Sequence, residues 1–97
     1  MTVARLYILH AVEGRAAQME AALEGLADVV RKAAGSEGVE VLRDLGNEHR
    51  FIFIEKWESE EAHGAALGSL PPGTIDPVQA ASDGPPDGSY YDYVKTV

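Results

Sequence analysis

The sequence lacks cysteine, has no long apolar run and contains few basic residues. Without cysteine the chain can form no disulfide, no thiolate metal site and no thiol nucleophile. No apolar run approaches the roughly 20 residues that a helix needs to cross a bilayer. The first twelve residues also lack the basic and apolar regions of a signal peptide. These absences predict a cytoplasmic protein.

The 8 basic residues stand against 16 acidic ones, which gives a net charge of −8. Nucleic acids and anionic membranes both attract positively charged surfaces, so we expect neither as a partner. The acidic residues are dispersed along the chain and are interpreted as solvated surface. The sequence contains no phosphate-binding loop, no nucleophilic triad and no metal-ligand spacing of His, Asp and Glu. A metal site is therefore not expected.

What the sequence does contain is typical of one folded domain that spans residues 1–97. Its residues are 45% hydrophobic, enough to bury a core. The segments that favour strands are residues 2–12, 39–45, 50–57 and 89–97. The third begins with the consecutive large apolar residues Phe51 to Ile54, which predicts burial on both faces. Residues 46–49 have the composition of a hairpin loop before it.

Two segments favour helices. Residues 16–34 carry an apolar stripe with helical spacing, formed by Met19, Leu23, Leu26, Val30 and Ala33. Gly35 is expected to follow the last turn of this helix as its C′ residue, and Asp28 is spaced to pair with Lys32. A second helix is expected over residues 59–69, with Ser59 as its N-cap.

Residues 71–88 differ from the rest because they hold all five prolines. The one short helix expected there is residues 76–81, with Asp76 as N-cap and Pro77 at the first helical position. A loop of this length is often a lid or an interface arm, and a tethered surface loop is an equal alternative.

The element order β-α-β-β-α-β predicts an α+β fold of the ferredoxin-like type. In that fold a four-stranded antiparallel sheet carries both helices on one face. Several strands look apolar on both faces, so the uncovered face would exceed the apolar area that a monomer tolerates. The sequence therefore predicts a homodimer in which these sheet faces pack together.

The strand-to-helix corner after Trp57 is the best candidate site. Trp57 shares a strand face with Phe53 and Glu55, and His63 follows on the next helix. A neutral imidazole is well matched to removing a phenolic proton. Arg5 is expected to pair with Glu55 across the sheet or to neutralise a phenolate.

The corner also carries a family resemblance. Residues 55–62, EKWESEEA, match an E-x-W-x-s-x-e-A pattern. With the element order and the Tyr-rich end, this resembles the antibiotic biosynthesis monooxygenase family, of dimeric ferredoxin-like fold. The resemblance implies oxygenation of an electron-rich phenol or anthrone by O2 without metal or flavin, in a dry aromatic pocket.

The chain departs from the patterns of two groups of relatives. Anthrone-oxygenating relatives use the corner Trp, an Asn four residues earlier and a Tyr six residues later, and here those positions hold Trp57, Phe53 and His63. Haem-degrading relatives rely on a helical His where this chain has Ala66 and Leu67, and on an Asn in the first strand, which is absent here.

The resemblance thus implies a cofactor-independent monooxygenase that oxidises a small aromatic substrate such as a quinol, an anthrone or a polyketide-type compound with O2. The catalytic candidates are His63 and Trp57. The substrate-binding candidates are Phe53, Trp57, His10, Tyr7 and Tyr91. One alternative is a non-catalytic homodimer of the same fold that binds a small ligand, and a less favoured one is a haem-binding or haem-degrading relative.

Overall fold

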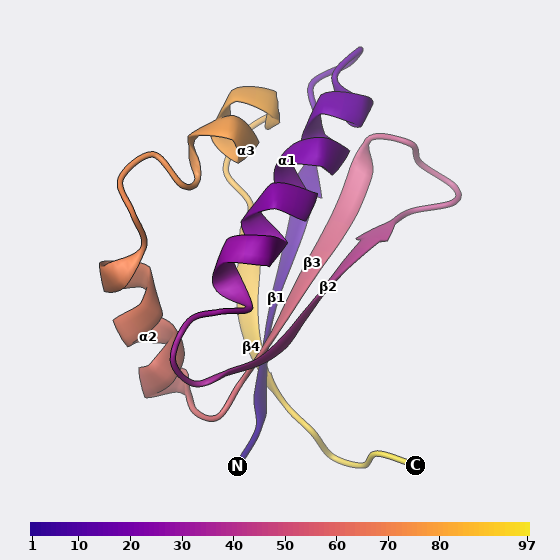
Figure 1. Cartoon of the computed structure of the whole chain (residues 1–97). Coiled ribbons are helices and arrows are strands. Elements are labelled where there is room, and N and C mark those ends of the chain that lie inside the picture. The colour runs from indigo at the N-terminus through magenta and orange to yellow at the C-terminus, as the bar shows by residue number, and fades with distance from the viewer.

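The computed structural model describes all residues from 1 to 97. Its elements are β1 (Val3–His10), α1 (Ala16–Val30), β2 (Ser36–Arg43), β3 (Arg50–Trp57), α2 (Glu60–Ser69), α3 (Asp76–Ala81) and β4 (Asp87–Asp92). The strands form one antiparallel sheet in the order β2-β3-β1-β4. Figure 1 shows α1 in front of this sheet, with α2 and α3 to its left. The predicted ferredoxin-like fold is confirmed.

The alternation of β3 decides which side of the sheet is the inside. Its buried residues are Phe51, Phe53, Glu55 and Trp57, while the residues between them are only partly buried. In the register with β1, Leu9 lies opposite Phe51 and Tyr7 lies opposite Phe53. Side chains at alternate positions share a face, so the odd-numbered residues of β1 and β3 face the helices. The other face we call the open face.

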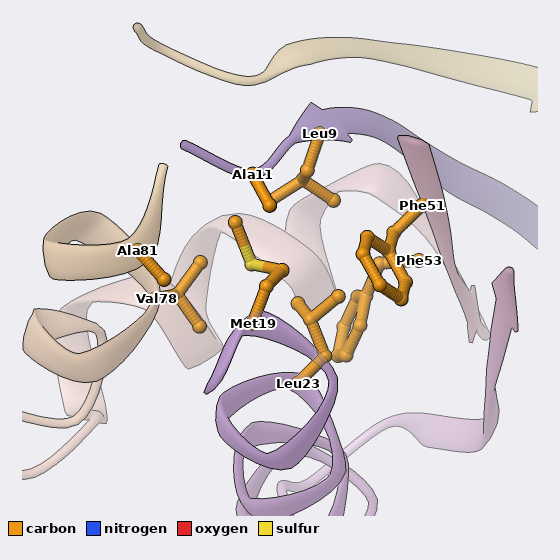
Figure 2. Packing of buried hydrophobic residues seen from close by; sticks show 8 residues of the cluster. All are labelled: Leu9, Ala11, Met19, Leu23, Phe51, Phe53, Val78 and Ala81. Atoms are coloured by element: carbon orange, nitrogen blue, oxygen red, sulfur yellow. The ribbon is translucent and has the colours of Figure 1, made fainter. Parts of the chain in front are cut away.

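The hydrophobic core lies between the sheet and two helices. Figure 2 shows Met19 and Leu23 of α1 pointing at residues of β1, β3 and α3. The buried cluster consists of Leu9, Ala11, Met19, Leu23, Phe51, Phe53, Val78 and Ala81. Met19, Leu23 and Val30 are all buried on α1, which confirms the predicted apolar stripe.

The first helix is shorter than expected, because it ends at Val30 and not at residue 34. Gly35 is therefore not its C′ residue. A Cβ on Gly35, whose φ is +84°, would lie 2.7 Å from the Cβ of Ala62 on α2. The glycine is needed so that the chain can pass α2 at close range. Asp28 also pairs with Arg31 at 3.4 Å, not with Lys32.

The proline-rich segment is more structured than its composition suggested. Helix α3 forms as predicted, although Ile75 and not Asp76 is its N-cap. Val12 N–H donates to the carbonyl of Ala81 at 2.9 Å, and Asp83 N–H donates to that of His10 at 2.7 Å. These bonds tie the segment to the end of β1. It is a wall of the domain, not a tethered surface loop.

Strand boundaries also differ from the prediction, most clearly in β4 and β2. Strand β4 begins at Asp87, inside the proline-rich segment, and ends at Asp92, so residues 93–97 leave the sheet (Figure 1). Strand β2 begins earlier than expected, at Ser36, where the β2–β3 register shifts between Ser36 and Gly38. Such an irregularity is hard to see in sequence because it interrupts the period of two.

The open face remains apolar in the single chain. Its apolar side chains are Leu6, Ile8, Leu42, Ile52, Ile54 and Tyr91. Leu42 is 45% exposed and Tyr91 is 51% exposed.

No helix of the protein has the length and apolar character needed to cross a membrane.

Candidate active site

A cavity of about 490 Å³ lies between the sheet and the helices. Its wall from α1 is apolar, and Phe53 and Leu9 close it at the sheet. The proline-rich segment supplies another wall through Ile75, Val78 and Pro86. This volume is within the range of small-molecule sites, which are mostly apolar with a few placed polar groups.

Two of the cavity's polar side chains, Tyr7 and Glu55, come from the central strands β1 and β3. Both are at the sheet side of the cavity, on the face that period-two alternation directs toward the helices. The opposite wall adds Gln79 and Ser82. The cavity therefore combines an apolar body with a phenol and a carboxyl group at one end.

Behind this end lies His63, which is 2% exposed. Its Nε2 lies 3.0 Å from the hydroxyl of Tyr7 and 3.5 Å from Oε1 of Glu55. Its Nδ1 lies 2.6 Å from the hydroxyl of Tyr90 on β4. The imidazole is thus held on both nitrogens, and α2 aims it at the sheet because the helix starts immediately after β3 at the Ser59 cap.

Trp57 fixes the carboxyl group of this cluster. The indole Nε1–H donates a hydrogen bond of 2.9 Å to Oε1 of Glu55, and both side chains are buried. The indole ring also packs against His63, with ring centroids 5.6 Å apart. Trp57 does not line the large cavity. It contributes by holding Glu55 where the cavity and the imidazole meet.

Burial moves the pKa values of Glu55 and His63 toward each other. Desolvation raises the pKa of Glu55, partly offset by the indole hydrogen bond and the charge of Arg5. Desolvation lowers the pKa of His63, and the Arg5 charge lowers it further. The neutral imidazole is therefore favoured.

Arg5 stacks on aromatic rings instead of pairing with Glu55. Its guanidinium lies 4.9 Å from the ring centre of Tyr7 and 4.4 Å from that of Tyr90. No ion pair joins it to Glu55, although the two residues are opposite in the β1–β3 register. The expected ion pair is wrong, and the guanidinium acts on the site through its charge. Burial raises the pKa of the Tyr7 hydroxyl, and the nearby guanidinium of Arg5 partly offsets this.

Gly88 makes room for this arrangement. It lies opposite Tyr7 in the β1–β4 register. A Cβ at this position would lie 2.8 Å from Nη2 of Arg5 and 2.9 Å from the ring of Tyr7. The phenol and the guanidinium can lie across β4 only because this residue has no side chain.

The structure brings together only some of the predicted site residues. Phe53 and Tyr7 line the cavity, while Trp57 and His63 lie behind it. His10 and Tyr91 lie on the open face and do not line the cavity. Because side chains alternate along a strand, both residues lie on the sheet face that points away from the helices.

Two functional candidates were missed by sequence reasoning. Glu55 shares the face of Trp57 and Phe53, and a carboxylate among buried residues was a usable signal. Tyr90 had no such signal, because its contact with His63 depends on the β1–β4 register. No group of three or more His, Asp or Glu side chains is arranged to hold a metal ion.

A known protein family matches this chain over most of its length, including the strand-to-helix corner after Trp57. The sequence model of the family described as antibiotic biosynthesis monooxygenase matches residues 3–81. The chain belongs to this family. No curated protein matches the sequence significantly. The monooxygenase family match includes the whole of β1, β3 and α2, and thus most of the cluster around His63.

Solved structures of low sequence identity share the fold. A protein of Bordetella bronchiseptica described as an antibiotic biosynthesis monooxygenase has a TM-score of 0.87 at 19% identity, over 97% of this chain and 98% of that chain. SnoaB, a cofactor-independent oxygenase from Streptomyces nogalater, has a TM-score of 0.84 at 18% identity, over 99% of this chain and 96% of its own. A Chloroflexus aurantiacus protein with the same family description reaches 22% identity at a TM-score of 0.78, over 100% and 97% of the two chains.

Proposed function

We propose that this protein is a cofactor-independent monooxygenase that oxidises a small aromatic hydroxy compound, such as a quinol or anthrone, with O2. The observation that carries the proposal is the apolar cavity that ends at Tyr7 and Glu55, with His63 contacting both groups. Family membership and the similarity of the fold to that of SnoaB support it.

The chemistry needs a base next to a dry aromatic pocket. Removal of the substrate's proton makes it electron-rich enough to give an electron to O2. One oxygen atom then enters the ring as a carbonyl oxygen, and the other leaves as water. The substrate supplies all the electrons, so no cofactor is consumed. The apolar walls keep water from the reactive oxygen intermediate.

His63 is the base in this proposal, and it acts through the groups at the end of the cavity. The substrate's proton passes to the Tyr7–Glu55 end and is held at Nε2 of the imidazole. The carboxylate of Glu55 stabilises the imidazolium that forms, 3.5 Å away. Trp57 keeps that carboxylate in place through its indole N–H. Phe53 and the apolar wall of α1 hold the aromatic body of the substrate.

We further propose that the active form is a homodimer joined through the open face of the sheet. The apolar side chains there, together with the 45% exposure of Leu42, suit a second copy of the same surface. Helices cover only the other face. Size-exclusion chromatography with light scattering measures the oligomeric state directly, and a stable monomer would contradict this arrangement.

Oxygen uptake tests the activity. Metal-free protein is mixed with a panel of hydroquinones, naphthoquinols and anthrones, and the rate of autoxidation is subtracted. We expect uptake that falls by about 10²–10⁴-fold in His63→Ala, as for loss of a positioned base. His49→Ala is the matched control, because that imidazole lies in the turn between β2 and β3 and does not line the cavity.

Two results would contradict the proposal. Equal oxygen uptake by His63→Ala and the wild-type protein would show that His63 is not the base. No uptake with any compound, while aromatic ligands still quench the fluorescence of Trp57, would favour the alternative of a non-catalytic binding protein. The absence of a polar side chain at Phe53 is the observation on which that alternative rests.

A further inference from the structure

The hydrogen bonds of His63 continue beyond the cavity. Nε2 faces Tyr7, which lines the cavity, and Nδ1 faces Tyr90, which does not. Tyr90 is 38% exposed, whereas His63 is 2% exposed. The three side chains therefore form one line of contacts from the cavity, through the buried core, to a tyrosine that is partly exposed. They come from three different elements, β1, α2 and β4.

We propose that Tyr7, His63 and Tyr90 form a proton path between the cavity and solvent, with Tyr90 as its outer gate. The proposal rests on the proposed oxygenase function in one respect: that function gives the path its purpose. The path itself is a property of the ligand-free protein, so it can be tested without a substrate.

Each side chain of the path can both give and receive a proton. In the outward direction, Tyr7 gives its proton to Nε2 and regains one from the substrate hydroxyl. Nδ1 gives its proton to the oxygen of Tyr90, whose own proton passes to water. One proton has moved from the substrate to solvent, and the imidazole is left in its other tautomer.

The inward direction restores the first tautomer. Cleavage of the oxygen–oxygen bond needs one proton for the oxygen that leaves as water. If that proton enters through Tyr90, Nδ1 is protonated again and Nε2 returns its proton toward Tyr7. Oxygenation removes one proton and later needs one, so a cycle of two opposite passages leaves the imidazole as it began.

The charges around the imidazole suit this role. The charged and titratable groups that face His63 are Arg5 and Tyr7 from β1, Glu55 from β3 and Tyr90 from β4. The guanidinium of Arg5 disfavours a lasting imidazolium, while the carboxylate of Glu55 favours a transient one. The ring of His63 contacts the hydroxyl groups of Tyr7 and Tyr90 directly, so neither Arg5 nor Glu55 lies between these groups.

The test is the solvent-exchange rate of the His63 ring proton, measured by water-saturation transfer on ¹⁵N-labelled, ligand-free protein. Tyr90→Phe keeps the ring that stacks on Arg5 and removes only the hydroxyl. If Tyr90 is the gate, exchange slows by about a hundredfold, the low end for loss of a positioned proton donor or acceptor. If the hydroxyl only anchors the ring, its loss loosens the site and exchange becomes faster.

Two control variants separate the path from general effects. Tyr93→Phe removes a hydroxyl that is 42% exposed on the same C-terminal segment and should leave exchange unchanged. Tyr7→Phe removes the inner end and should also leave exchange with solvent intact. Unchanged or faster exchange in Tyr90→Phe, or equal slowing in Tyr93→Phe, would overturn the proposal.

With a substrate in hand, turnover gives a second readout. Tyr90→Phe should lower kcat with little change in KM, and small buffers at high concentration should restore part of it by carrying the proton themselves. Tyr7→Phe should lower kcat without such rescue. An absence of any turnover would count against the oxygenase alone, because the exchange rates still decide the path.

Discussion

Trp57→Phe should destabilise the protein chiefly through Glu55. The indole is 1% exposed, and its N–H is the hydrogen bond of 2.9 Å to the buried carboxyl group. Loss of a hydrogen bond to a charged group costs about 1.5–3 kcal/mol. The smaller ring leaves a cavity that adds about 1 kcal/mol. In a domain of this size 1 kcal/mol moves Tm by about 4–8 °C, so a loss near 3 kcal/mol should lower Tm by more than about 10 °C.

The hydrogen bond and the cavity can be separated by a double-mutant cycle with Glu55→Met, which keeps the side-chain length and removes the acceptor. In that background Trp57→Phe should cost only the cavity contribution, which leaves a coupling energy of about 2 kcal/mol. Thermal unfolding followed by circular dichroism at one protein concentration measures all four variants. Additivity of the two substitutions within about 0.5 kcal/mol would refute the coupling.

The same cycle has a pH dependence of known sign. The indole N–H lowers the pKa of Glu55, so its removal raises that pKa further. Burial already raises it, which means that ionisation of Glu55 costs stability as the pH rises through its folded-state pKa. The loss caused by Trp57→Phe should therefore be larger in alkaline than in acidic buffer. A pH-independent loss would show that the cavity contribution dominates.

Three further outcomes are expected. Gly88→Ala should cost about 1–3 kcal/mol in urea denaturation because its Cβ overpacks the ring of Tyr7, whereas Gly64→Ala, with open space around it, should stabilise α2 by about 0.5–1 kcal/mol. The pKa of His63 is lower in the folded than in the unfolded chain, so the unfolded chain binds this proton first and stability should fall as the pH drops through about 6.5. In His63→Gln this part of the pH dependence should vanish, and an unchanged profile would contradict the assignment. Ile52→Lys on the open face should give a folded monomer by light scattering, and an intact dimer would place the interface elsewhere.

Much of the fold could be predicted because it depends on local patterns. The period of two in β3 placed Phe53, Glu55 and Trp57 on one face, and the structure buries all three, whereas the predicted burial of Ile52 and Ile54 is only partial in the single chain. The apolar stripe of α1 and the Ser59 cap of α2 were read in the same way, and the cap accepts a bond from Ala62 N–H at 3.1 Å. These features involve residues within a few positions of one another.

The boundaries that failed depend on long-range contacts. Helix α1 ends at Val30, and Gly35 then brings the chain close to Ala62 of α2, a contact between residues far apart in the sequence. The start of β4 at Asp87 is set by pairing with β1, which prolines at 85 and 86 did not prevent because they precede the ladder. Pattern and propensity carry no information on such pairings.

The sequence by itself determined the element order, the residues of β3 that share a face with Trp57, and the family, through the pattern of residues 55–62. The tertiary structure alone decided the site. His63 lies 56 residues from Tyr7 and 27 from Tyr90 along the chain, yet its ring contacts both hydroxyl groups. Which face of β1 and β4 meets α2 depends on strand register and helix packing, and these are properties of the folded chain as a whole.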